Sequence, residues 1–323
     1  MTPSMFARVL LAAAVFTAAP QTRPAAPAPA PPAKSAAFDS GLALQVALDR
    51  AGFSVGIIDG APGSNTRKAV AAYQSAMGSA PDTAAAPALT QYVVTAADTA
   101  GPFSENIPED MMEKSKLPGL YYSSVAEALG ERFHTSPEVL KRLNPTATFA
   151  AGETLTVPNV NVVEMPQAGP AAPPAAAAPK APPVKAPSVT VTVSKSASAA
   201  TVTDASGKVI FYAPVTSGSE HDPLPIGKWA VTAIVRNPTF NYNPDLFWDA
   251  EPKDAKAKIP AGPNGPVGVV WIDITKPHYG LHGTPEPRTI GHTQSHGCVR
   301  LTNWDAMRLA GLVSKGTVVV FTR

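Results

Sequence analysis

The sequence contains a single cysteine, Cys298, in 323 residues. One cysteine cannot form an internal disulfide, so a fold held by a disulfide framework is excluded. A free thiol in an oxidising compartment is a chemical liability, because it reacts with oxidants and with other thiols. A lone cysteine in a secreted chain therefore requires a reason, and catalysis is one such reason.

The chain also lacks a large excess of positive or negative charge. The chain has 26 lysine and arginine residues against 24 acidic residues, which leaves a net charge of +2. Such a balance argues against a nucleic-acid binder that relies on a strong basic field. Aromatic residues are few as well, with 4 Trp, 7 Tyr and 11 Phe, too few for one large core spread over the whole length.

Long apolar runs are absent beyond the N-terminus, so no transmembrane helix is predicted there. Residues 9–19, VLLAAAVFTAA, follow Arg8 and form an apolar run too short to span a bilayer. This pattern is typical of a secretory signal peptide, which we predict for residues 1–19, with an uncleaved anchor as the alternative. The run is not followed by a cysteine, which excludes a lipoprotein anchor. The predicted location is periplasmic or secreted.

Proline, in contrast, is abundant, with 36 residues, many of them in two Pro/Ala tracts. The first tract covers 20–37 and the second covers 163–188. Such tracts stay extended and bury little apolar surface, so both are predicted to be linkers. They divide the chain into a front part, 38–162, and a back part, 189–323.

The front part opens with LALQVALDRAGFSVGIIDGAPGSNTRKAVAAYQSAMG, residues 42–78. Apolar spacing predicts a helix before Gly52, then a turn and a second helix, with an N-cap signal in Ser64, Asn65 and Thr66. This pattern resembles the peptidoglycan-binding-like domain and predicts such a domain over 38–95, with peptidoglycan as its partner. The alternative is a helical hairpin without a ligand. The resemblance is carried by Leu44, Gln45, Leu48, Gly52, Asp59, Gly60, Gly63, Thr66, Ala69, Tyr73 and Gln74.

Residues 118–162 carry a second pattern. Helical spacing around Leu129 and Leu140, a cap at Thr135 and Ser136, and the strand-like ETLTVPN predict a short α+β module. The pieces Leu143-Asn144-Pro145 and Gly152 to Pro158 resemble a LysM domain, which implies binding to N-acetylglucosamine polymers. The usual opening GDTL segment is missing, so a spacer without sugar binding is the alternative.

The back part is predicted to be mainly β, a sandwich with one short helix. Alternating residues in 188–218, with a turn at 204–207, predict strands, and GKWAVTAIVRNP, PVGVVWIDI and GTVVVFTR continue the pattern. The one predicted helix starts after Thr302, where Thr302 and Asp305 fit a capping box.

Three of the six histidines share the segment HGTPEPRTIGHTQSHGCVRLTNWD, residues 282–305, with Cys298. A cysteine attacks a carbonyl as a thiolate, and a nearby imidazole can take its proton and stabilise it as an ion pair. His296 lies so close in the chain that it meets the sulfur poorly, whereas His282 approaches from another segment. We therefore expect a Cys298 thiolate paired with His282.

A metal site is the alternative, because His278, His282, His292, His296 and Cys298 provide ligand types that zinc accepts. The histidine pairs lie near Gly and Pro and do not form helical ligand pairs. A zinc hydrolase also needs a carboxylate base, and only Glu286 is available in this stretch. No metal and no cofactor are expected.

The HGT at His282 followed by SHGCVRL at 295–301 resembles the L,D-transpeptidase catalytic domain, also called the YkuD domain. The resemblance covers 189–323 and is supported by PLPIGKW at 223–229. It implies a wall-facing cysteine enzyme that cuts a tetrapeptide stem before D-alanine and passes the acyl group to an amine. It also implies inhibition by β-lactams such as carbapenems.

The resemblance implies a role for each matching residue. Cys298 is the nucleophile and His282 the base, oriented through the Gly283 carbonyl. Ser295, His296 and Gly297 shape the oxyanion site, with the Gly297 and Cys298 N–H groups as donors. Arg300 and Tyr279 contact the substrate; Arg300 stands where some members have Asn.

Two functional alternatives remain open at the level of sequence. The first is an L,D-carboxypeptidase, in which water replaces the amine acceptor. The second is a wall-binding protein with an inert catalytic domain, against which the intact His282, Gly297, Cys298 and Arg300 argue.

Overall fold

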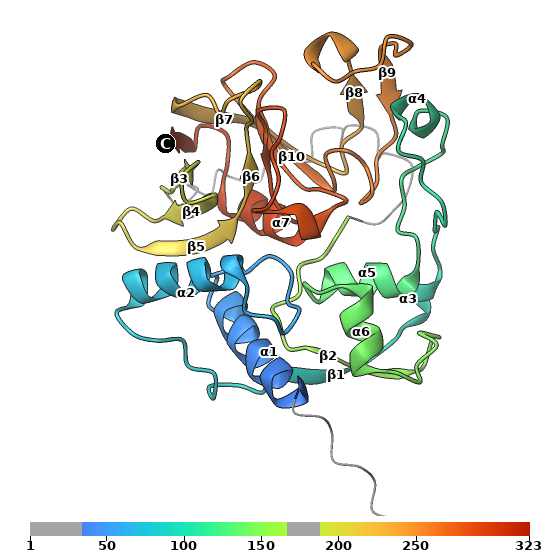
Figure 1. Cartoon of the computed structure of the whole chain (residues 1–323), viewed down its shortest axis with the longest axis vertical. Coiled ribbons are helices and arrows are strands. Elements are labelled where there is room, and N and C mark those ends of the chain that lie inside the picture. The colour runs from blue at the N-terminus through green and yellow to red at the C-terminus, as the bar shows by residue number, and fades with distance from the viewer. Residues whose placement is uncertain (1–33, 167–187) are drawn as a thin grey trace, which may run out of the picture. The chain divides into compact units, whose positions relative to one another are not determined.

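The computed structural model describes residues 34–166 and 188–323, which form one unit (Figure 1). The predicted signal peptide, residues 20–33 of the first linker and residues 167–187 of the second lie outside the described residues. Among the residues that are described, no helix is both long and apolar enough to cross a membrane.

Two helices, α1 (Lys34–Arg50) and α2 (Ser64–Met77), open the front part. α1 begins inside the predicted linker. Gln45 on α1 holds the turn between the helices, because its Oε1 accepts a hydrogen bond from the Gly60 N–H at 2.8 Å. Its Nε2 donates to Asp59 Oδ1 at 2.8 Å and to Thr66 Oγ1 at 3.1 Å. The motif residues Gln45, Asp59, Gly60 and Thr66 therefore stabilise the turn between the two helices.

The predicted N-cap of α2 is wrong. The cap residue is Gly63, without a side-chain hydrogen bond, and Ser64 is already helical. Asn65 instead donates from Nδ2 to the Ile290 carbonyl of the back part at 2.9 Å. Thr66 accepts from Gln45, so contacts with distant residues use side chains that could have capped the helix.

The α+β module is confirmed in its elements, which are α5 (Val125–Arg132), α6 (Pro137–Leu143) and β2 (Thr154–Pro158). Ser136 caps α6 through its hydroxyl, as predicted, and Asn144 follows the helix end. β2 pairs antiparallel with β1 (Leu89–Val93), a strand that the sequence places in the preceding domain. Two helices shorter than six residues, α3 (Ala96–Thr99) and α4 (Met111–Lys114), were not predicted.

The back part contains a nine-stranded sheet of order β5-β4-β3-β13-β7-β10-β11-β12-β6. The strands expected in all four sequence stretches are present. The bounds are β3 (Thr190–Ser194), β4 (Ala199–Thr203), β5 (Val209–Pro214), β6 (Thr216–Ser217), β7 (Gly227–Arg236), β10 (Val270–Ile274), β11 (Gly280–His282), β12 (Val299–Arg300) and β13 (Val318–Thr322).

The long strand β7 joins the two halves of this sheet. Residues 227–230 pair with β13, and residues 231–236 pair with β10. Buried side chains of both halves and of α7 (Asn303–Leu312) belong to one core cluster. The core therefore lies between the sheet halves and the helix, in keeping with the predicted mainly β fold.

Helix α7 starts as predicted, with Thr302 accepting from the Asp305 N–H. Only half of the expected capping box forms in the structure. The Asp305 carboxylate accepts from the Thr302 hydroxyl at 2.8 Å and from the Ser54 hydroxyl at 2.7 Å. Asp305 therefore connects the cap of α7 to the front part.

The front part packs directly on the back part, whereas the Pro/Ala tract predicts two bodies on a flexible tether. Arg308 of α7 donates to the Asp49 carboxylate at 3.1 Å, and His134 Nδ1 lies 3.1 Å from the same carboxylate. Phe53 stacks with Tyr212 at a ring separation of 6.3 Å. This contact surface is both polar and apolar, and it fixes one part against the other.

A hairpin follows β7. It consists of β8 (Phe240–Tyr242), the 3-10 turn η1 (Pro244–Leu246) and β9 (Ala257–Ile259). Tyr242 and Ile259 form a small core with Leu120 of the front part. The front part therefore supports a hairpin that borders the cleft described next.

Candidate active site

Two short parallel strands, β11 and β12, position the site. Leu281 lies opposite Val299, and His282 lies opposite Arg300. Side chains alternate between the faces of a strand, so Cys298, His282 and Arg300 point to the same face. All three line a cleft of about 1390 Å³. The structure thus brings together three of the predicted site residues.

His282 is buried and held from two sides. Its Nδ1 lies 2.6 Å from the Gly283 carbonyl oxygen, and its ring stacks on Trp271 at 5.4 Å. A carbonyl only accepts hydrogen bonds, so Nδ1 carries the proton of the neutral ring and Nε2 keeps a lone pair. Burial, followed by the charge of Arg300, lowers the pKa of His282 to about 3.

Cys298 is a free, half-buried thiol. Its Sγ lies 3.7 Å from the His278 carbonyl oxygen. Burial raises the pKa of the thiol, although the Gly280 N–H and the Arg300 charge act in the opposite direction. Before substrate binds, burial therefore favours the neutral thiol and the neutral imidazole over the predicted ion pair, because it disfavours both charged forms.

Ser295 shapes the loop before the cysteine from the inside. Its buried hydroxyl donates to the Cys298 carbonyl at 2.6 Å and accepts from the Gly218 N–H at 2.7 Å. The loop is thereby tied to the chain after β6. The Ser295 hydroxyl donates its only proton to the Cys298 carbonyl, so its role in this structure is to hold the loop in place.

Gly297 has a φ of +92°, a conformation that side chains rarely adopt. A Cβ at this position would stand 2.6 Å from the ring of Tyr279. Tyr279 lines the cleft beside Cys298, and burial raises the pKa of its hydroxyl. Glycine is therefore required here, both by the backbone and by the neighbouring ring.

His296 belongs to the border of the cleft. Its Nε2 lies 2.8 Å from Asp249 Oδ1, and its ring packs 5.1 Å from Phe247 and 5.8 Å from Trp248. These contacts attach the loop before Cys298 to the hairpin. They direct His296 Nε2 toward Asp249.

The histidines of the zinc alternative are divided between two cavities. His278, His282 and His296 line the cleft, whereas His292 lines a separate cavity. Within residues 34–166 and 188–323, no group of three or more His, Cys, Asp or Glu side chains is arranged to hold a metal ion.

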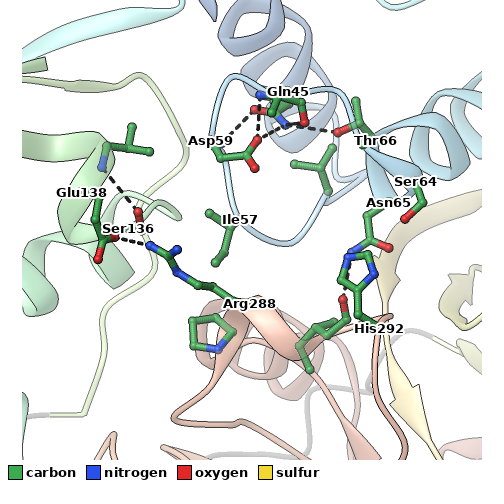
Figure 2. Close-up of a pocket in the computed structure, with 16 residues that line it drawn as sticks. Gln45, Ile57, Asp59, Ser64, Asn65, Thr66, Ser136, Glu138, Arg288 and His292 are labelled. Atoms are coloured by element: carbon green, nitrogen blue, oxygen red, sulfur yellow. Dashed lines mark hydrogen bonds and ion pairs between the residues drawn. The ribbon is translucent and has the colours of Figure 1, made fainter. Parts of the chain in front are cut away.

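The separate cavity, of about 430 Å³, lies where the front part meets residues 287–292 of the back part (Figure 2). Arg288, from the short turn η2 (Pro287–Thr289), pairs with Glu138 of α6. Asn65 and His292 also line this cavity, and Asn65 donates to the Ile290 carbonyl. The front part thus contacts the chain a few residues ahead of Cys298.

Several residues of the site escape sequence reasoning. Trp271 and Asp249 lie far from the motif in the chain and carry no local signal. Asn303 stands in the predicted cap region but packs against Gly283, and Glu131 of the front part accepts hydrogen bonds from Asn303. Only the structure reveals these contacts, because sequence patterns report neighbours along one element.

Two family models match parts of this chain. Residues 188–321 match the family described as "L,D-transpeptidase catalytic domain", and residues 42–84 match "Putative peptidoglycan binding domain". These matches confirm the predicted catalytic domain in the back part and the peptidoglycan-binding domain in the front part. Neither match covers the LysM-like segment, which stays a prediction.

Individual relatives share part of their length with this chain. The "Putative L,D-transpeptidase YkuD" of Bacillus subtilis is 46% identical over 61 residues, which are 19% of this chain and 37% of the relative. The "Probable L,D-transpeptidase ErfK/SrfK" of Salmonella typhimurium is 34% identical over 127 residues, 35% of this chain and 40% of the relative. These two relatives are thus matched over well under half of their length.

A solved structure of an L,D-transpeptidase from Mycobacterium smegmatis is also similar. It shares 20% identity with a TM-score of 0.35, and the alignment covers 42% of this chain and 59% of that one.

Proposed function

We propose that this protein is a periplasmic or secreted cysteine L,D-transpeptidase that acts on peptidoglycan. The observation that carries the proposal is the shared face of β11 and β12, where Cys298, His282 and Arg300 open onto one cleft. The match of residues 188–321 to the catalytic domain family supports it. The match of residues 42–84 supports peptidoglycan as the partner of the front part.

In the first half-reaction, Cys298 Sγ attacks the carbonyl carbon of the peptide bond between the third stem residue, diaminopimelate, and D-alanine. His282 Nε2 takes the thiol proton as the C–S bond forms, because neither group is charged beforehand. The oxyanion accepts hydrogen bonds from the Gly297 and Cys298 N–H groups. The C–N bond then breaks, and His282 returns the proton to the amine of the departing D-alanine.

In the second half-reaction, the amine of an acceptor attacks the thioester carbonyl. His282 Nε2 accepts the amine proton and delivers it to the departing Cys298 sulfur. Arg300 binds a substrate carboxylate in the cleft, and Tyr279 forms the wall beside the scissile bond. Carbapenems acylate the same sulfur, because their strained amide presents a carbonyl to it.

Product analysis of the full chain with disaccharide-tetrapeptide tests this proposal. We expect D-alanine to be released together with a crosslinked dimer, which mass spectrometry of the separated products detects. D-alanine with only monomeric tripeptide, even with added amine acceptor, would assign the protein as an L,D-carboxypeptidase. An unchanged substrate with a freely alkylatable Cys298 would instead favour the inert wall-binding protein.

A further inference from the structure

His282 depends on the backbone of Gly283, whose carbonyl accepts from Nδ1 at 2.6 Å. The Cα of Gly283 is closed off by Asn303, since an added Cβ would stand 2.1 Å from Asn303 Oδ1. Any displacement of Asn303 therefore allows Gly283 to move. A change in the Gly283 carbonyl direction weakens the bond that selects the tautomer of His282.

Asn303 itself is fully buried and held by its amide group. Its Oδ1 accepts from the Val269 N–H at 3.1 Å. Its Nδ2 donates to Glu131 Oε1 at 2.9 Å and Oε2 at 3.0 Å, and to the Pro263 carbonyl at 3.2 Å. Donors and acceptors on opposite sides fix the orientation of the amide, which has no equally good reversed position.

Glu131 comes from α5 in the front part and is almost fully buried. Its other hydrogen-bond donor is the Tyr122 hydroxyl, at 2.9 Å from Oε2. Burial raises the pKa of Glu131 to about 8. Burial among neutral partners penalises the charged form of the carboxyl group, so this contact costs free energy as Glu131 ionises.

We propose that Glu131 and Asn303 are positioning residues for His282, so that the front part completes the catalytic apparatus of the back part. Glu131 orients Asn303, Asn303 holds the Gly283 backbone, and the Gly283 carbonyl keeps the proton on Nδ1. His282 Nε2 is thereby left with its lone pair toward the cleft. The inference rests on the proposed function, in which Nε2 accepts the Cys298 proton.

The test compares three variants of the full chain. Glu131→Leu removes the acceptors, Glu131→Gln keeps a hydrogen-bonding amide of similar shape, and Asn303→Ala removes the link while leaving Glu131. Glu127→Leu is the matched control on the same helix, because Glu127 accepts bonds from Ser123 and Asn264 and none from Asn303. The readouts are kcat and KM for D-alanine release and nitrogen NMR of labelled histidine, with His282 assigned from a His282→Gln spectrum.

We expect Glu131→Leu and Asn303→Ala to lower kcat roughly 10- to 100-fold with little change in KM, as small misplacements of catalytic groups do. The His282 signals should move from the Nδ1–H tautomer toward a mixture of both tautomers. Glu131→Gln should restore most of the rate and the wild-type signals, and Glu127→Leu should retain both.

Unchanged His282 signals and kcat in folded Glu131→Leu or Asn303→Ala would overturn the inference and leave a merely structural contact. If Glu131→Leu does not fold, Asn303→Ala decides alone. If the wild-type chain releases no D-alanine, the proposed function fails, whereas the NMR comparison still supports or overturns the positioning of His282.

Discussion

Replacing Cys298 with serine is expected to reduce D-alanine release from disaccharide-tetrapeptide by at least about 10³-fold, as removal of a catalytic nucleophile does in well-studied hydrolases. Serine is close to cysteine in size, so the strand pairing and the cleft remain. A hydroxyl is a far weaker acid than a thiol, and His282, with its pKa lowered to about 3, is a weak base. The remaining pair therefore cannot form the nucleophile efficiently.

The matched control for this prediction is His292→Ala. His292 belongs to the same histidine-rich segment but lines the separate cavity, so the rate should stay near that of the wild type. The rate is measured by chromatography of released D-alanine, and circular dichroism checks the fold of each variant. A Cys298→Ser variant that keeps more than a tenth of the wild-type rate would contradict the assignment of Cys298 as the nucleophile.

The second large expected effect is a pH dependence of the free energy of unfolding. It arises from Glu131, which lies at the contact between the front part and the back part. Glu131 has a pKa raised by burial from 4.5 to about 8. Its stabilising contribution is therefore complete below pH 4.5 and is lost as pH rises toward 8, because folding then requires a proton that the unfolded chain no longer holds. A shift of this size corresponds to roughly 3–5 kcal/mol of unfolding free energy.

The difference in unfolding free energy between the wild type and Glu131→Gln isolates this contribution, because the contributions of the other titrating groups are the same in both proteins and cancel. These groups include Asp305, whose pKa burial raises to about 6, and His282, whose lowered pKa acts with the opposite sign. We expect the variant to gain stability relative to the wild type between pH 4.5 and 8.5, measured by urea unfolding of the full chain. Glu105→Gln, at an exposed position, should show no such trend. A difference that is flat with pH would mean that Glu131 titrates normally.

The local features of the site could be predicted from the sequence. The segment around Cys298 is contiguous, and the HGT triplet ends a strand, so the strand pairing of β11 and β12 places both motifs together. The strands β3, β4, β5, β7, β10 and β13 follow from alternation, and α7 follows from its cap, whereas β8, β9 and β12 carry no such signal. These signals lie within single elements, where periodicity and capping report structure directly.

Other features depend on contacts between distant segments and could not be predicted. β1 lies within the predicted peptidoglycan-binding-like domain but pairs with β2 of the following module, a contact between segments far apart in the chain. The polar residues at the start of α2 resembled a cap but bind Gln45 and Ile290. A charged residue such as Glu131 is expected at the surface from its type alone, and its burial follows only from the packing of the front part on α7.

The protonation states of Cys298 and His282 also follow from packing. A cysteine and a histidine in one motif predict an ion pair, but burial penalises the charge of each and favours the neutral forms. Proton transfer is thereby tied to the attack on substrate. The Gly283 carbonyl, positioned by Asn303 and Glu131 in the inference above, then determines which nitrogen of His282 can receive the proton.

In the proposed function, Cys298 carries the acyl group of the substrate as a thioester. The most direct test of this claim is acid-quenched mass spectrometry of the full chain mixed with disaccharide-tetrapeptide in the absence of acceptor, followed by peptide mapping. We predict an adduct equal to the substrate less D-alanine, attached to the peptide that contains Cys298 and absent from Cys298→Ala. D-alanine release that persists in Cys298→Ala, or an adduct on any other residue, would contradict the account.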